Sequence, residues 1–171
     1  MTETLLITAQ EVTEFVGVTE KIEEQYLNPH IRNMQQIELK QLLGVPLFNS
    51  LVLAVEQDQV TGATLSLLNE VKAPLAYYVM SAAYYDISYK VTRKGILRQL
   101  DDGSEAPSDA MIAMKAQQAR DTATSFSNDL IDWLETNKAS YELYRSDDTT
   151  STDKRTGSAI FTGYNKKTSR Q

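Results

Sequence analysis

The strongest constraint on the fold is one segment that is apolar or aromatic on every side when it is drawn as a helix. It runs from Ala73 to Val91 and reads APLAYYVMSAAYYDISYKV. A helix of this kind must be enclosed by other helices or by a neighbouring chain. Its tyrosine hydroxyls each need a hydrogen-bond partner, which favours a partly hydrated setting. We predict a buried central helix, with a subunit interface as the alternative reading. The interface residues would be Tyr77, Tyr84, Tyr85 and Tyr89.

Capping signals predict the first helix. Thr8, followed three residues later by Glu11, is a capping box. It predicts a helix from Ala9 to about Val16 that ends at Gly17.

The second predicted helix is capped by Thr19 and ends at Gly44. Pro29 is expected to kink it or divide it in two, with Asn28 capping the second part. One stripe of this helix is apolar and should pack against the central helix. Its residues are Tyr26, Leu27, His30, Met34 and Ile37.

Two shorter helices are predicted next, from Pro46 to about Gln59 and from Ala63 to about Val71. After the central segment, residues 91–100 read VTRKGILRQL and precede the turn signal Asp102-Gly103. We predict a short β-hairpin, or tongue, near residues 91–103. Its partner contacts would be Arg93, Lys94, Ile96, Leu97 and Arg98.

The last predicted helix is capped by Ser108 and reaches at least Asn137. Its seam alternates in steps of four and three residues, as in a coiled coil. The seam residues are Ile112, Ala116, Ala119, Ala123, Phe126, Leu130, Trp133 and Asn137.

After Arg145 the sequence becomes polar and loses its periodicity, which predicts disorder in isolation. One apolar cluster, Ala159 to Phe161, stands in this tail. It is typical of a strand that pairs with a partner's sheet edge, although a cluster without function is the alternative. The predicted partner-binding residues are Ile160, Phe161, Tyr164, Lys166 and Lys167.

These patterns predict a mainly α protein: a bundle of about five helices with a β tongue and an extended C-terminal tail. Residues 1–146 form the helical domain, and residues 147–171 form a flexible arm that orders on a partner. The net charge of −6 divides into −8 on residues 1–146 and +2 on residues 147–171. An acidic body argues against broad binding to nucleic acid.

The sequence indicates neither an enzyme nor a metal or cofactor site. Cysteine is absent, and no long apolar run or signal peptide is apparent, so we expect a soluble protein made in the cytoplasm. His30, the one histidine, fits a core position better than a ligand or base. Asp86 falls on an apolar face of the central helix, where burial would raise a carboxyl pKa. A pair with Lys90 or a hydrogen bond to another helix is the favoured reading of Asp86.

The order of these signals resembles the head–tail connector (adaptor) proteins of tailed bacteriophages, especially the form found in crAss-like and related phages. Met34 departs from that pattern, which usually has alanine there. The matching residues are Ile7, Thr8, Glu11, Tyr26, Leu27, Pro29, Ile31, Gln35, Leu42, Leu43, Gly44, Leu47, Phe48, Leu51, Tyr77, Tyr78, Lys94, Gly95, Ile96, 104–108 and the Gly-flanked cluster in the tail.

The resemblance implies a virion protein at the neck that assembles in the host cytoplasm. Such proteins form a homo-oligomeric ring, commonly of twelve copies, beneath the portal protein. The ring would extend the DNA channel without binding DNA specifically, and would carry the next tail or stopper protein. The alternative is a monomeric helical binding or regulatory module whose basic tail contacts nucleic acid. An enzyme built around Asp86 is a third, weaker reading.

Overall fold

The computed structural model describes residues 4–18, 22–92, 95–98 and 108–144, with only the backbone for 89–92 and 95–98. The predicted tail contacts Ile160, Phe161, Tyr164, Lys166 and Lys167 lie outside the described residues, as do Arg93 and Lys94. In the described part the chain is mainly helical, as the sequence predicts. The elements are α1 (Ala9–Val16), α2 (Glu24–Met34), the π-helix η1 (Gln35–Leu39), α3 (Lys40–Leu43), α4 (Val45–Glu56), α5 (Gly62–Ser88), β1 (Tyr89–Thr92), β2 (Gly95–Arg98), α6 (Asp109–Asn137) and the 3-10 turn η2 (Lys138–Ser140).

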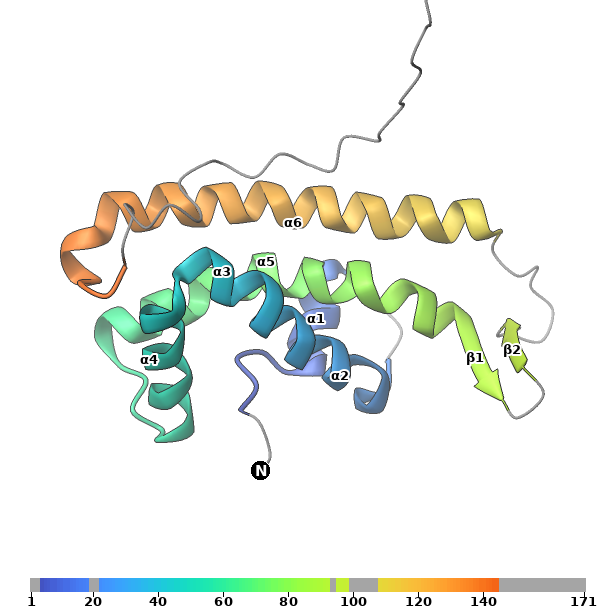
Figure 1. The fold of residues 1–171 in the computed structure, drawn as a ribbon, viewed down its shortest axis with the longest axis horizontal. Helices are drawn as coiled ribbons and strands as arrows, with labels where there is room; N and C mark the ends of the chain where they lie inside the picture. The colour runs from blue at the N-terminus through green and yellow to red at the C-terminus, as the bar shows by residue number, and fades with distance from the viewer. Residues whose placement is uncertain (1–3, 19–21, 93–94, 99–107, 145–171) are drawn as a thin grey trace, which may run out of the picture.

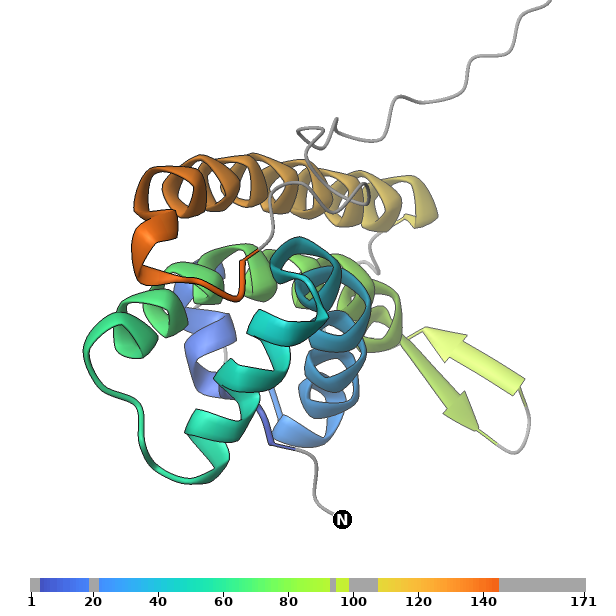
Figure 2. The same cartoon turned by 60° about the vertical axis from the view of Figure 1, so that its left-hand side comes forward.

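Helix α5 lies at the centre of the bundle (Figure 1). Helix α6 runs along one side of it, and α1 to α4 cover the other side. Strands β1 and β2 continue from the end of α5 and project beyond the helices (Figure 2). They pair antiparallel, with Tyr89 opposite Arg98 and Thr92 opposite Gly95.

Helix α5 is one continuous helix from Gly62 to Ser88, so the prediction of two helices separated before Pro74 is wrong. Pro74 is buried inside the helix, where it removes one backbone hydrogen bond. Packing on both sides of α5 offsets that loss. The buried residues of α5 are Leu67, Val71, Pro74, Leu75, Ala76, Tyr78, Val79, Met80, Ser81 and Ala83.

Helix α1 matches its prediction, including the capping box and a left-handed Gly17 at its end. Helix α2 does not match. It begins at Glu24, its N-cap is Glu23, and it continues through Pro29 with Asn28 inside it. Thr19, the predicted cap, lies outside the described residues.

The predicted stripe of α2 fails at Ile37, whose exposed fraction is 58%. The buried residues instead follow Leu27, Ile31, Gln35 and Glu38 in steps of four, four and three residues, a face on which Ile37 does not lie. The π-helix η1 carries three of the buried residues, Gln35, Glu38 and Leu39.

Gln35 connects the buried side of η1 to the segment before α1. Its side-chain oxygen accepts a hydrogen bond from the Leu6 amide at 3.3 Å, and its side-chain nitrogen donates to the Thr4 carbonyl at 2.9 Å. Gln35 itself is fully buried. The Gln35 side-chain amide therefore satisfies two backbone groups of the segment before α1, and this holds Leu6 in the core.

The predicted seam of α6 holds at Ile112, Ala116, Ala119, Ala123 and Leu130, which are buried. It fails at Phe126, which is 36% exposed, because Ser127, Ile131 and Leu134 are buried in the second half. A strict seven-residue repeat drifts by about 20° per heptad on a straight α-helix, so the buried side moves off it.

A polar network joins η1, α5 and α6 within the bundle. Arg120 donates to the largely buried Glu38 carboxylate at 3.2 Å, and its guanidinium lies 5.6 Å from the centre of the Tyr78 ring. The Tyr78 and Ser127 hydroxyls are 3.2 Å apart. These contacts fix the position of α6 along α5.

We predict that Gln35→Leu lowers the free energy of unfolding by about 2 kcal/mol, because the Leu6 amide and Thr4 carbonyl lose their partner. Urea unfolding followed by circular dichroism measures the change. The control is Gln36→Leu, one residue along and exposed, which should change stability by less than about 0.5 kcal/mol. Equal effects of the two substitutions would contradict the assigned role of Gln35.

A second prediction concerns pH. Partial burial alone would raise the pKa of Glu11, but hydrogen bonds from Lys72, at 2.6 Å, and from Thr8 outweigh it and lower that pKa below its ordinary 4.5. Glu11 therefore stabilises the fold above pH 4.5, and the contribution is lost as pH falls through the lowered value. The stability difference between wild type and Glu11→Gln should shrink from pH 7 toward pH 3. A difference independent of pH would contradict the pairing.

Candidate interaction surface

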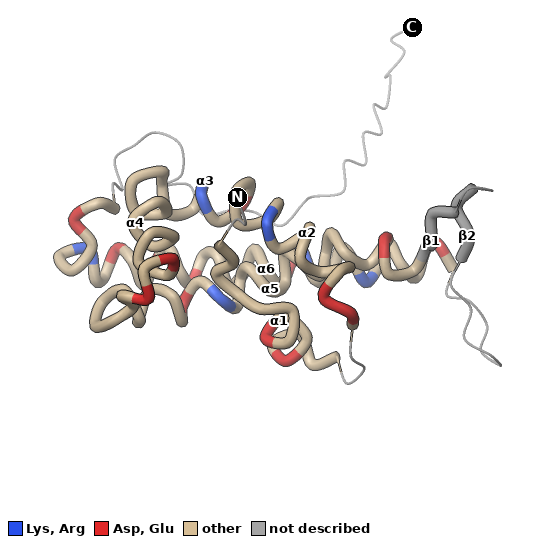
Figure 3. Tube along the Cα trace, turned by 90° about the horizontal axis from the view of Figure 1, so that it is seen from below, with Lys and Arg blue, Asp and Glu red and all other residues tan. Residues whose placement is uncertain are grey.

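Among the residues that the structure describes, no group of three or more histidine, aspartate or glutamate side chains could hold a metal ion. In the same residues, no helix is long and apolar enough to span a membrane. Figure 3 shows basic residues as isolated positions along the helices rather than as a cluster. The candidate functional features in the described residues are exposed polar and aromatic side chains.

Asp86 does not lie on a buried apolar face; it contacts a neighbouring helix, as the favoured reading of this residue expects. Its side chain is 67% exposed, and Oδ2 lies 2.9 Å from Nε2 of His30, whose side chain is 15% exposed. The pair connects α2 to the last turn of α5, immediately before β1. His30 is thus a partner of Asp86 rather than a purely apolar core residue. Lys90, the one partner of Asp86 that the sequence analysis names, lies in β1, where side chains are not described.

Tyr77 of α5 contacts both neighbouring helices, α6 through its ring and α1 through its hydroxyl. The Tyr77 ring stacks on Phe126, with centroids 5.5 Å apart and planes 29° apart. The Tyr77 hydroxyl donates to the Phe15 carbonyl at 3.2 Å. Phe15 is 42% exposed and Phe126 is 36% exposed, so both phenylalanines reach the surface. Phe126 joins Tyr77 through its ring, whereas Phe15 joins it through its backbone carbonyl.

Tyr84 extends this group of aromatic residues along α5, because it lies two turns after Tyr77 on the same face. Burial, and then the nearby Tyr77, raises the pKa of Tyr84. We call Phe15, Tyr77, Tyr84 and Phe126 the aromatic surface.

Of the four tyrosines predicted as interface candidates, Tyr77 and Tyr84 lie on one face of α5, and Tyr85 lies on another. Tyr85 is 46% exposed and lies about 100° further round α5 than Tyr84. It is therefore on the side of Tyr78, against which Arg120 packs. The Tyr89 side chain is not described. Of the tongue residues, Ile96, Leu97 and Arg98 lie in β2, with only their backbone described.

Sequence reasoning did not identify Phe15 and assigned Phe126 to the core. The exposure of Phe126 could have been predicted, because a seven-residue repeat drifts by about 20° per heptad around a straight helix such as α6. Phe15 sits in the last turn of α1, two residues before Gly17, and its partners come from distant parts of the chain.

We predict that Asp86→Ala lowers the unfolding free energy by less than about 1 kcal/mol, since one partner of the pair is well exposed. The control is Asp129→Ala, an exposed carboxylate on α6, and urea unfolding compares the two. A loss of about 3 kcal/mol or more would instead identify a desolvated pair.

Comparison with known proteins gives one match. Residues 39–154 match the model of a family of unknown function, DUF6712. The matched range includes α4, α5, both strands and α6. No curated protein and no solved structure matches the chain. Because the family model covers more than half of the sequence, the chain belongs to the DUF6712 family.

Proposed function

We propose that this protein is a structural subunit of a tailed-bacteriophage virion: a head–tail connector that forms a ring beneath the portal. The proposal starts from the order of sequence signals that resembles connector proteins. The observation that carries it is the aromatic surface, in which the partly exposed Phe126 stacks on Tyr77 and the exposed Phe15 accepts the Tyr77 hydrogen bond through its carbonyl. A subunit that meets copies of itself needs such a surface.

The aromatic surface has the chemistry of an interface centre. Aromatic side chains are enriched among the residues that contribute most to protein binding. The stacking of Tyr77 on Phe126 and the hydrogen bond of Tyr77 to α1 hold the rings in fixed positions. A preorganised surface loses less conformational entropy when a neighbouring copy covers it.

The strands and the tail would act as arms. The β1–β2 pair projects beyond the helices (Figure 2), and a two-stranded sheet leaves backbone groups on its outer edges for a partner strand. The tongue would contact a neighbouring copy. The tail, through Ile160 and Phe161, would add a strand to the portal or to a neighbour.

The charge of the body suits a channel through which DNA passes. Residues 1–146 carry a net charge of −8, which would repel phosphates rather than hold them. Specific DNA binding is not part of the proposed role. The partners are neighbouring copies, the portal protein and the next tail component.

The first test measures particle mass. Wild-type chain, alone and mixed with the portal of the same phage, is examined by light scattering and negative-stain imaging. We expect portal-dependent rings, and we expect Phe126→Ser to lower ring formation at least about tenfold. Leu53→Ser, which removes another half-exposed apolar side chain, should assemble normally.

Circular dichroism confirms that both variants remain folded. Wild type that stays monomeric with portal would contradict the connector role and favour the binding-module alternative. Equal assembly of the two variants would exclude the aromatic surface.

A second test removes the arm. Truncation after Ser146 should leave the helical circular dichroism signal and lower assembly with the portal at least about tenfold, because the arm contributes a separate contact. Assembly of the truncated protein at the wild-type level would contradict the role of the arm.

A further inference from the structure

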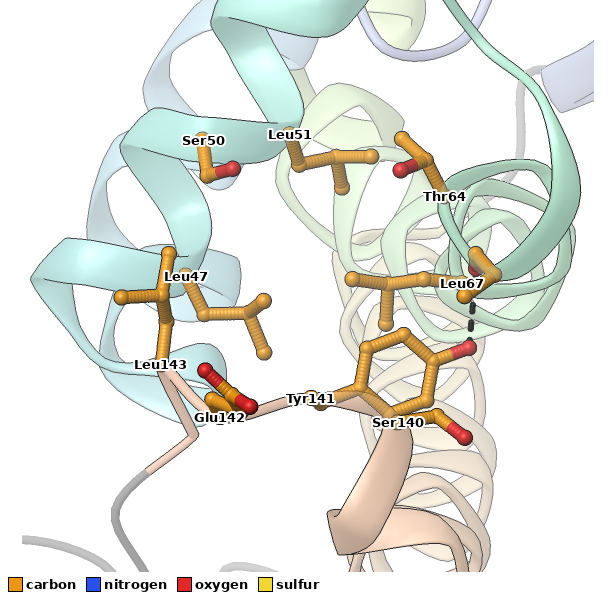
Figure 4. Close-up of a pocket in the computed structure, with 10 residues that line it drawn as sticks. Leu47, Ser50, Leu51, Thr64, Leu67, Ser140, Tyr141, Glu142 and Leu143 are labelled. Atoms are coloured by element: carbon orange, nitrogen blue, oxygen red, sulfur yellow. Dashed lines mark hydrogen bonds between the residues drawn. The ribbon is translucent and has the colours of Figure 1, made fainter.

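A pocket of about 130 Å³ (Figure 4) lies at the end of the bundle away from the strands (Figure 1). It is formed by α4, the first turns of α5 and the segment around η2. Its lining residues are Leu47, Ser50, Leu51, Ala63, Thr64, Leu67, Ser140, Tyr141, Glu142 and Leu143. The volume is that of about four waters, comparable with one apolar side chain.

The walls of this pocket are held firmly. The Tyr141 hydroxyl donates to the Ala63 carbonyl at 2.8 Å, and its ring lies 5.3 Å from Trp133. Leu47, Leu51 and Leu67 are buried below it, whereas Leu143 is 46% exposed at its edge. An apolar side chain that entered the pocket would cover Leu143 and reach the core.

The surroundings of the pocket are acidic. Glu142 lines it, and Glu70 lies near enough to add to the effect of burial in raising the pKa of Tyr141. Lys138 on η2 pairs with Glu135 at 4.0 Å, so its charge is matched there. A ligand with an apolar centre and cationic flank would complement this site.

The chain's own tail has this composition. It leaves the described structure after Tyr144, the residue next to Leu143. Its apolar cluster is Ala159–Phe161, and its last 18 residues carry a charge of +5 with no acidic residue. The 16 residues from Tyr144 to Ile160 can span up to about 50 Å. As a flexible chain they average about 20 Å end to end, which gives a local concentration of order millimolar.

We propose that this pocket binds one apolar side chain of the Ile160–Phe161 segment of the same chain. In the free subunit the tail is then held on its own body. A partner that needs the tail must displace it from the pocket. The inference does not rest on the connector role, because it concerns the isolated chain.

The test is amide hydrogen exchange, read by NMR, on the full chain without any partner. In wild type the amides of residues 159–161 should exchange about tenfold more slowly than in a free peptide of residues 156–171. Leu143→Ser should return them to the free-peptide rate. Leu53→Ser, a half-exposed leucine of α4 outside the pocket, should leave the protection unchanged.

Phe161→Ser supplies the reciprocal measurement, since it should shift the resonances of pocket residues Thr64 and Ser140. Free-peptide exchange in wild type, or equal protection in the two leucine variants, would overturn the proposal. Protection that rises with protein concentration would overturn it in favour of binding to a second copy. None of these results decides whether the protein forms rings with the portal, which the particle-mass test measures separately.

Discussion

The enclosure of α5 is the constraint on which the other elements depend. A helix that is apolar nearly all round cannot face water, and each fully buried large side chain contributes about 1.5–3 kcal/mol. Helix α6 covers one side of it, and α1, α2 and η1 cover the other. The consequence is a bundle whose outer surfaces are the remote faces of the helices around α5, together with the strands that extend α5.

Polar contacts then select one arrangement of this apolar bundle. Gln35 holds the N-terminal segment, Glu38 and Arg120 join η1 to α6, and His30 and Asp86 join α2 to the end of α5. Buried polar groups are costly without partners, so an alternative packing that breaks these pairs is disfavoured. The aromatic surface is a product of this selection, because it needs α1, α5 and α6 in register.

Local sequence signals were sufficient where the cause of a structure is local. The capping box at Thr8, the glycine stops at Gly17 and Gly44 and the Ser108 cap all appear in the structure. Reasoning from sequence failed where the cause is tertiary. Helix α5 continues through Pro74 because it is packed on both sides, and α2 with η1 buries the face of Ile31 and Glu38 rather than that of Ile37. Neither is encoded in periodicity alone.

The candidate interaction surface also combines residues that the sequence predicts with residues that only tertiary contacts reveal. Tyr77 and Tyr84 are among the four tyrosines that the sequence predicts as interface candidates, whereas Phe15 enters through a contact between residues far apart in the chain. Asp86 was singled out, but its pairing with His30 depends on the angle between α2 and α5. The pocket near Tyr141 could not be anticipated, because it forms where α4 and the segment after α6 meet.

The central claim is that the aromatic surface works as a contact between copies of this chain. A cryo-EM reconstruction of the full-length protein assembled with its portal tests it most directly. The account predicts that Phe15 and Phe126 of each copy are covered by the adjacent copy. A ring in which both side chains remain exposed to solvent, with the contact made through α4 alone, would contradict it.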